Sequence, residues 1–131
     1  MFANLFNSEE KENFLELVYK IATCDGEYAA EEEELVNNYK IELSINNIPE
    51  TKSISELIEY FSHKETPLKK VVFFELYGMI MADSYIADNE SKILDYLKEK
   101  FTLNEKEYLK MITAANELQR AYDLVYDAVF N

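Results

Sequence analysis

The feature that most constrains the fold is an apolar stretch from Val71 to Ala82, in which Glu75 is the only charged residue. Wound into a helix, this stretch has no polar side to turn toward water. It therefore predicts a central helix that other helices cover. The stretch is too short to span a bilayer. Thr66 and Pro67 predict its start, as an N-cap followed by Pro at the first helical position.

Length and composition predict one globular domain. A chain of 131 residues can bury roughly two thirds of the surface that it exposes when unfolded. Hydrophobic residues make up 48% of it, as in folded rather than disordered chains. With only two Gly and two Pro, and with apolar residues recurring at a helical period, the chain is expected to be all-α.

Helical periodicity divides the chain into about six or seven helices. Helix starts are expected at Asn7–Glu10, near Ala30 and near Asp88, and capping boxes at Ser53–Glu56 and Thr102–Glu105. The last segment, running to Phe130, is long for one helix, so we expect a break near Ala115 and Asn116. Within the central helix, Gly78 predicts a close approach of two helices.

The charge balance restricts the partners. The formal net charge is −13, and most of the excess of acids lies in the first half of the chain. Phosphate backbones and anionic lipids need Lys and Arg, so we expect neither nucleic-acid binding nor membrane insertion. A divalent cation or a basic protein partner fits the charge. The single Cys24 permits no internal disulfide, and the start of the chain resembles no signal peptide, so a cytoplasmic location is expected.

The sequence repeats itself at an offset of 58 residues, which places Asp25 on Asp83 without a gap. The acid after each junction also matches, because Glu32 falls on Glu90. The apolar faces align as well: Leu35, Val36, Tyr39 and Leu43 fall on Ile93, Leu94, Leu97 and Phe101. We interpret this as a duplicated helix–acidic junction–helix unit, with repeats at about 12–65 and 68–125 that cover each other's apolar faces.

The two junctions, 25–32 and 83–90, resemble the D-G-x-hydrophobic-x-x-x-E signature of the tellurite-resistance TerB family. The second copy is degenerate, since Ser84 stands where Gly is usual. The resemblance covers most of the chain. It implies a compact helical fold, no enzymatic activity, and a clustered acidic surface that binds metal ions in tellurite or stress resistance. Carried onto this sequence, the metal candidates are Asp25, Glu32, Asp83 and Glu90, followed by Glu27, Glu31 and Asp88.

Two interpretations of these acids stay open. A hard divalent cation needs several oxygen ligands at once, and an Asp ending one helix can converge with a Glu in the first turn of the next. Alternatively, Asp25 and Asp83 accept backbone hydrogen bonds as caps, while Glu32 and Glu90 complete capping boxes. The second interpretation explains the spacing without a metal.

A second function class is an acidic protein-interaction module, such as a toxin-immunity protein. Residues 14–18 and 32–36 are similar to the first two helices of the colicin DNase immunity proteins, but the Tyr-Tyr-Pro stretch of those proteins is missing. No phosphate-binding loop, nucleophile elbow or catalytic triad pattern occurs. His63 is expected to be a solvated loop residue, and Cys24 a core thiol rather than a nucleophile.

Overall fold

The described residues, 2–24, 30–81 and 88–131 of a computed structural model, form helices and connecting loops without a strand. The elements are η1 (Ala3–Leu5), α1 (Ser8–Ala22), α2 (Ala30–Leu43), α3 (Ile54–Ser62), α4 (Thr66–Met81), α5 (Asp88–Lys100) and α6 (Glu105–Phe130). The expected all-α class is therefore confirmed. No helix in the described ranges is both long and apolar enough to cross a bilayer.

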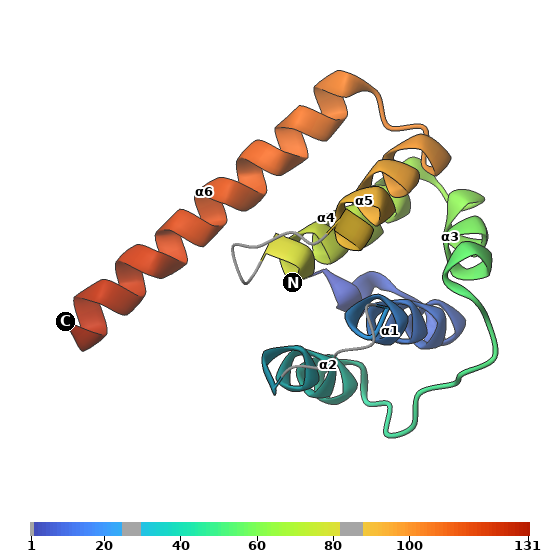
Figure 1. Cartoon of the computed structure of the whole chain (residues 1–131), viewed down its shortest axis with the longest axis horizontal. Helices are drawn as coiled ribbons and strands as arrows, with labels where there is room; N and C mark the ends of the chain where they lie inside the picture. Colours follow the sequence, from blue (N-terminus) through green and yellow to red (C-terminus); the bar gives the residue numbers. More distant parts are fainter. Residues whose placement is uncertain (1, 25–29, 82–87) are drawn as a thin grey trace.

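The helices form two neighbouring pairs joined by α3 (Figure 1). α1 packs along α2, and α4 packs along α5, while α3 contacts α1 on one side and both α4 and α5 on the other. The core between them contains fully buried Phe14, Phe61, Phe73 and Phe101. One continuous core supports a single domain.

Local signals predict most helix starts because they act within one turn. Asn7 caps α1 by accepting a hydrogen bond from the Glu10 N–H at 2.9 Å, and the Glu10 carboxylate in turn accepts one from the Asn7 N–H. Ser53 and Glu56 form the expected capping box of α3. α4 begins at Thr66 itself, one residue earlier than expected, because the carbonyl of Glu65 accepts the first hydrogen bond, from Lys69 N–H.

The predicted capping box at Thr102–Glu105 is wrong, because Thr102 ends α5 instead of starting α6. Its φ of 50° is left-handed, and the Leu103 N–H reaches back to the carbonyl of Lys98 at 3.2 Å. This is a Schellman motif, which closes a helix end. α6 is capped by Asn104, whose side chain accepts a hydrogen bond from the Glu107 N–H at 2.7 Å.

Two expectations about helix packing are also wrong. α6 continues through Ala115 and Asn116 as one helix of 26 residues, since neither residue prevents helical hydrogen bonding. Gly78 is exposed, and a Cβ at this position would meet no described atom of another segment within 4 Å. The central helix α4 thus has a small exposed side at Gly78, while Val72, Phe73 and Leu76 are fully buried as expected.

Candidate functional site

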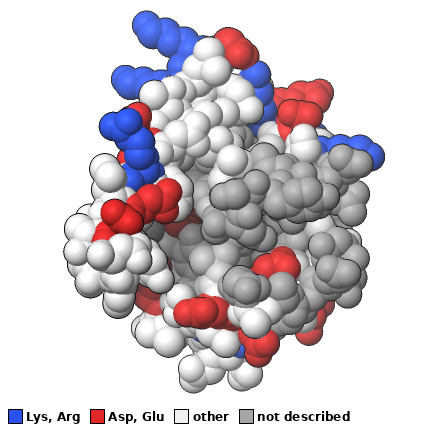
Figure 2. All heavy atoms as spheres, turned by 60° about the vertical axis from the view of Figure 1, so that its left-hand side comes forward, with Lys and Arg blue, Asp and Glu red and all other residues white. Residues whose placement is uncertain are grey.

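Basic side chains are unevenly distributed over one face of the molecule. On the face that Figure 2 shows, most Lys and Arg side chains lie in the upper half, whereas Asp and Glu side chains occur in both halves. Lys70, Lys106 and Lys110 line one hollow of about 620 Å³ beside the start of α6. Lys70 lies 3.8 Å from the carboxylate of Glu107. With a formal net charge of −13, the chain as a whole attracts cations rather than anions.

Most of the predicted metal ligands lie outside the described residues. This applies to Asp25, Glu27 and Asp83 entirely, and to the side chains of Glu31, Asp88 and Glu90. Glu32 alone has a described side chain, which is half-buried in the first turn of α2. Within the described ranges, no three His, Cys, Asp or Glu residues are grouped closely enough to hold a metal ion. The proposed convergence of these acids stays a prediction.

The helices that flank the two junctions keep the register of the sequence repeat. α2 begins at Ala30 and α5 at Asp88, so Glu32 and Glu90 each occupy the third helical position. The two helices also end alike. Ser44 has a φ of 57°, and the Ile45 N–H bonds the carbonyl of Lys40 at 2.9 Å. This Schellman motif lies 58 residues before the one at Thr102.

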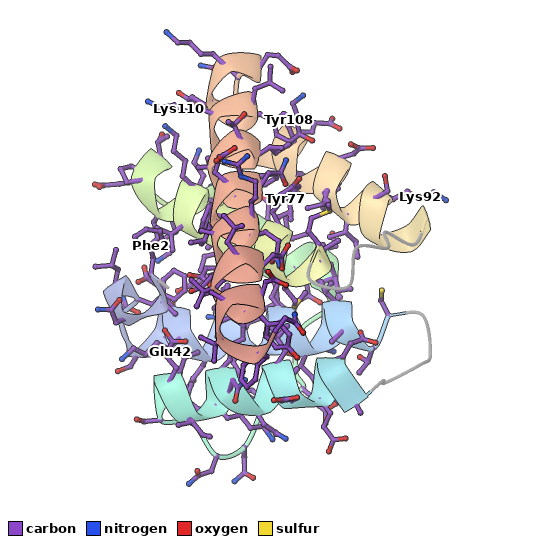
Figure 3. The ribbon with its side chains drawn as sticks, turned by 90° about the vertical axis from the view of Figure 1, so that its left-hand side faces the viewer. Phe2, Glu42, Tyr77, Lys92, Tyr108 and Lys110 are labelled. Carbon is purple, nitrogen blue, oxygen red and sulfur yellow. The ribbon has the colours of Figure 1, made fainter. Side chains whose placement is uncertain are left out.

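The described helix ends beside the two junctions lie on one side of the molecule. In Figure 3 the end of α1 and the starts of α2 and α5 all lie toward the right, as the labelled Lys92 of α5 indicates. Equivalent helix starts thus come from both halves of the chain. The acids at positions 32 and 90 are therefore carried by helices whose N-terminal ends face the same side.

A buried carboxylate in the centre of the molecule is the main polar feature that the sequence analysis missed. Glu75 of α4 is 7% exposed and accepts a 2.6 Å hydrogen bond from the Tyr39 hydroxyl. It also accepts a 2.7 Å hydrogen bond from the Phe2 N–H. Burial raises the pKa of Glu75, but the hydrogen bonds that the carboxylate accepts outweigh burial and hold its pKa below the usual value. Burial first, and then the Glu75 charge, raise the pKa of Tyr39.

Glu75 and Tyr39 therefore connect α2, α4 and the start of the chain in one charge-assisted network. A lone charge in an apolar run was the available signal, because a buried carboxylate requires donors. Sequence could not identify Tyr39 as the donor, since its spacing also fits an ordinary apolar position. The Tyr39–Glu75 hydrogen bond is buried, and the geometry of the network is that of a structural link between helices.

We expect Tyr39→Phe to lower the free energy of unfolding by about 2 kcal/mol at neutral pH, because it removes a donor from a buried charge. The depressed pKa of Glu75 contributes stability above the unfolded pKa of about 4.3 and loses it as the pH falls. The raised pKa of Tyr39 contributes stability below about pH 10 and loses it as the pH rises.

Tyr39→Phe should therefore lower the free energy of unfolding most between about pH 4.3 and pH 10, and less at lower and higher pH. Urea unfolding across the pH range measures this effect. Tyr60→Phe is the control, because it removes a 2.8 Å hydrogen bond from a tyrosine hydroxyl to the exposed carboxylate of Glu9. A cost that does not change with pH would contradict the assignment of this hydrogen bond to a charged carboxylate.

A second buried carboxylate holds the long loop between α2 and α3. Glu16 is 1% exposed, and one of its oxygens accepts hydrogen bonds from the N–H groups of Thr51 at 2.9 Å and Lys52 at 2.8 Å. The Lys20 ammonium lies 3.8 Å away. Glu16 lines a hollow of about 380 Å³ together with Glu9, Glu12, Asn13, Pro49, Thr51, Lys52 and Tyr60.

The two remaining predicted singletons differ in part from expectation. His63 is exposed at the end of α3, and its ring lies 3.0 Å from the carboxylate of Glu59. Lys100 bonds the same carboxylate at 3.2 Å. The hydrogen bond from Lys100, followed by that from His63, lowers the pKa of Glu59. Cys24 is half-buried rather than a core thiol, because α1 has already ended at Ala22.

The fold and these contacts define a single-domain, all-helical, acidic protein. Comparisons of the chain with protein-family models, with curated proteins and with solved structures find no significant match. The TerB resemblance therefore rests on the junction motifs and the repeat.

Proposed function

We propose that this chain is a non-enzymatic, cytoplasmic, acidic module that binds divalent metal ions at its two helix junctions. Asp25, Glu32, Asp83 and Glu90 supply the principal ligands, and Glu27, Glu31 and Asp88 supply further contacts. The resemblance to the TerB family assigns this binding to tellurite or stress resistance. The observation that best supports the proposal is the common register of α2 and α5, which start and close alike at the 58-residue offset.

The proposed chemistry follows from the donor set. Carboxylate oxygens suit hard cations such as calcium, magnesium or manganese, which take six or more oxygen ligands including water. Equivalent helix starts on the same side of the molecule carry Glu32 and Glu90, and in the sequence an Asp precedes each of these acids by seven residues. The strongly negative chain also attracts cations before they bind.

Thermal unfolding of chelator-treated protein, with and without each divalent ion, tests the proposal. An ion at 100 times its dissociation constant should stabilise the native state by about 2.7 kcal/mol. For a domain of this size the midpoint should rise by several degrees. The double variant Asp25→Asn/Asp83→Asn should lose the shift, whereas Glu33→Gln, on the exposed side of α2, should keep it. No shift with any ion, or a shift that the double variant retains, would contradict metal binding at the junctions.

The acidic interaction module is a second candidate, favoured by the surface of α2. Glu33, Glu34 and Glu42 are exposed on this helix, where a basic partner such as a toxin could contact them. This candidate predicts a graded, salt-sensitive loss of partner binding when Glu27, Glu31 and Glu34 are replaced by Gln. A metal site instead predicts an abrupt loss of ion binding that is confined to the junction residues.

A further inference from the structure

The C-terminal half of α6 exposes more apolar surface than any other described segment. The first half of this helix packs on the core, with the Tyr108 ring 5.6 Å from that of Phe73 on α4. Beyond Leu118 the helix extends away from the other helices (Figure 1). Six large apolar side chains there are 60–69% exposed: Tyr122, Leu124, Val125, Tyr126, Val129 and Phe130.

The apolar residues of α6 follow a continuous heptad pattern. They alternate in steps of three and four residues through Tyr108, Met111, Ala115, Leu118, Tyr122, Val125 and Val129. Such a pattern forms a straight seam on a helix that packs along another helix. The first part of the seam lies against the body of this molecule, where Tyr108, Met111 and Ala115 are half-buried. The second part, from Tyr122 onward, has the same spacing and is exposed.

The polar groups beside the exposed seam are already partnered within α6. Gln119 donates a 3.0 Å hydrogen bond to Asp123, and Arg120 lies 3.6 Å from Glu117. Asn131 donates a 2.9 Å hydrogen bond to Asp127. An apolar partner that covers the seam would therefore not leave these polar groups without hydrogen-bond partners. Residues 118–130 contain a single basic side chain, Arg120, whereas helices bound at a membrane surface carry several Lys and Arg on their polar face.

We propose that Leu118, Tyr122, Val125 and Val129 of α6 (the exposed seam) form an interface with the same residues of a second copy of this chain, in antiparallel orientation. This inference is independent of metal binding at the junctions. Val125, near the middle of the exposed seam, lies close to the twofold axis. Antiparallel pairing holds the two acidic bodies at opposite ends of the helix pair, where charge repulsion is screened.

The exposed area is sufficient for such a pair. Phe and Tyr side chains bury roughly 150–250 Å² each when fully covered, so Tyr122, Tyr126 and Phe130, with smaller contributions from Val125 and Val129, can bury on the order of 600 Å² in each copy. Two copies would bury roughly 1,200 Å², at the lower end of the range for stable interfaces. We therefore expect a weak, reversible dimer with a dissociation constant in the micromolar range.

The sharpest test is a matched pair of charge substitutions on adjacent residues of α6. Val125→Glu places a charge in the seam, whereas Leu124→Glu places it about 100° around the helix, outside the seam, at a similarly exposed position. In sedimentation equilibrium from about 1 to about 200 µM, Val125→Glu should weaken the dimer at least about 100-fold, because it buries an unpaired charge. Leu124→Glu should leave the dimer within about threefold of the unmodified chain. Thermal unfolding of both variants checks that the body stays folded.

Cross-linking then tests the orientation in a Cys24→Ser background. A mixture of Leu118→Cys and Val129→Cys chains should form mixed disulfides if the helices are antiparallel, and each chain alone should cross-link poorly. Efficient cross-linking of Leu118→Cys chains with each other would overturn the antiparallel arrangement. A chain that stays monomeric at the highest concentration, whether or not it binds vesicles, would overturn the dimer itself. Equal effects of the two Glu substitutions would also overturn it.

Discussion

Replacing Phe14 by Ala is expected to lower the free energy of unfolding by about 3–5 kcal/mol. Phe14 of α1 is fully buried, and its ring lies 5.0 Å from that of Phe6 and 5.4 Å from that of Tyr39 on α2. Truncation removes a large buried surface and leaves a cavity where three segments meet. A loss of this size is a large part of the stability of an ordinary domain.

Urea unfolding followed by circular dichroism measures this effect. Ile41→Ala is the control, because Ile41 lies on α2 but is 78% exposed, and it should change stability by less than about 0.5 kcal/mol. If Phe14→Ala cost no more than Ile41→Ala, the core position of Phe14 would be wrong.

Glu16→Ala is expected to cost about 3 kcal/mol, because a buried carboxylate that bonds two backbone N–H groups is removed. The N–H groups of Thr51 and Lys52 lose their acceptor, so the loop between α2 and α3 should also become more sensitive to proteolysis. Glu12→Ala is a matched control, since Glu12 lies on the same helix and lines the same hollow but is exposed. Equal stability and equal cleavage of the two variants would contradict the anchoring role of Glu16.

Glu16 and Glu75 show that two of the acidic side chains of this chain are buried, where they link distant segments. Each carboxylate lies within the helical body and accepts hydrogen bonds from distant segments, so each replaces the water that it loses on burial. Tyr39 and the Phe2 N–H donate hydrogen bonds to Glu75, while backbone N–H groups of the loop between α2 and α3 donate to Glu16. Neither carboxylate is among the acids proposed to bind metal, and substitutions at these two positions should change stability rather than ion binding.

For the proposed metal site, the sequence repeat predicts which acids are equivalent, but not whether their carboxylates converge. Equivalent acids at Glu32 and Glu90 follow from the 58-residue offset, and the starts of α2 and α5 match it. Convergence of carboxylates depends on side-chain positions in space. Asp25 and Asp83 lie outside the described residues. Their role is measured directly by comparing ion binding of the Asp25→Asn/Asp83→Asn variant with that of the unmodified chain.

The sequence by itself determined the helical class, most helix starts and the buried faces. Asn7, Ser53 and the apolar period act within one or two turns, so their effects can be recognised without knowledge of distant contacts. Tertiary structure decided the rest. Tyr39 and Glu75 are 36 residues apart in the chain, and no local pattern relates them.

The continuity of α6 was likewise decided by packing, because local propensity permits both a break at Ala115 and an unbroken helix. Contact of Tyr108 with Phe73 fixes the first half of α6 on α4, and helical hydrogen bonding carries the axis outward beyond the body. The apolar stripe of Tyr122, Val125 and Val129 is thereby left exposed. Periodicity identifies an apolar face, but only the positions of the other helices determine whether that face is covered.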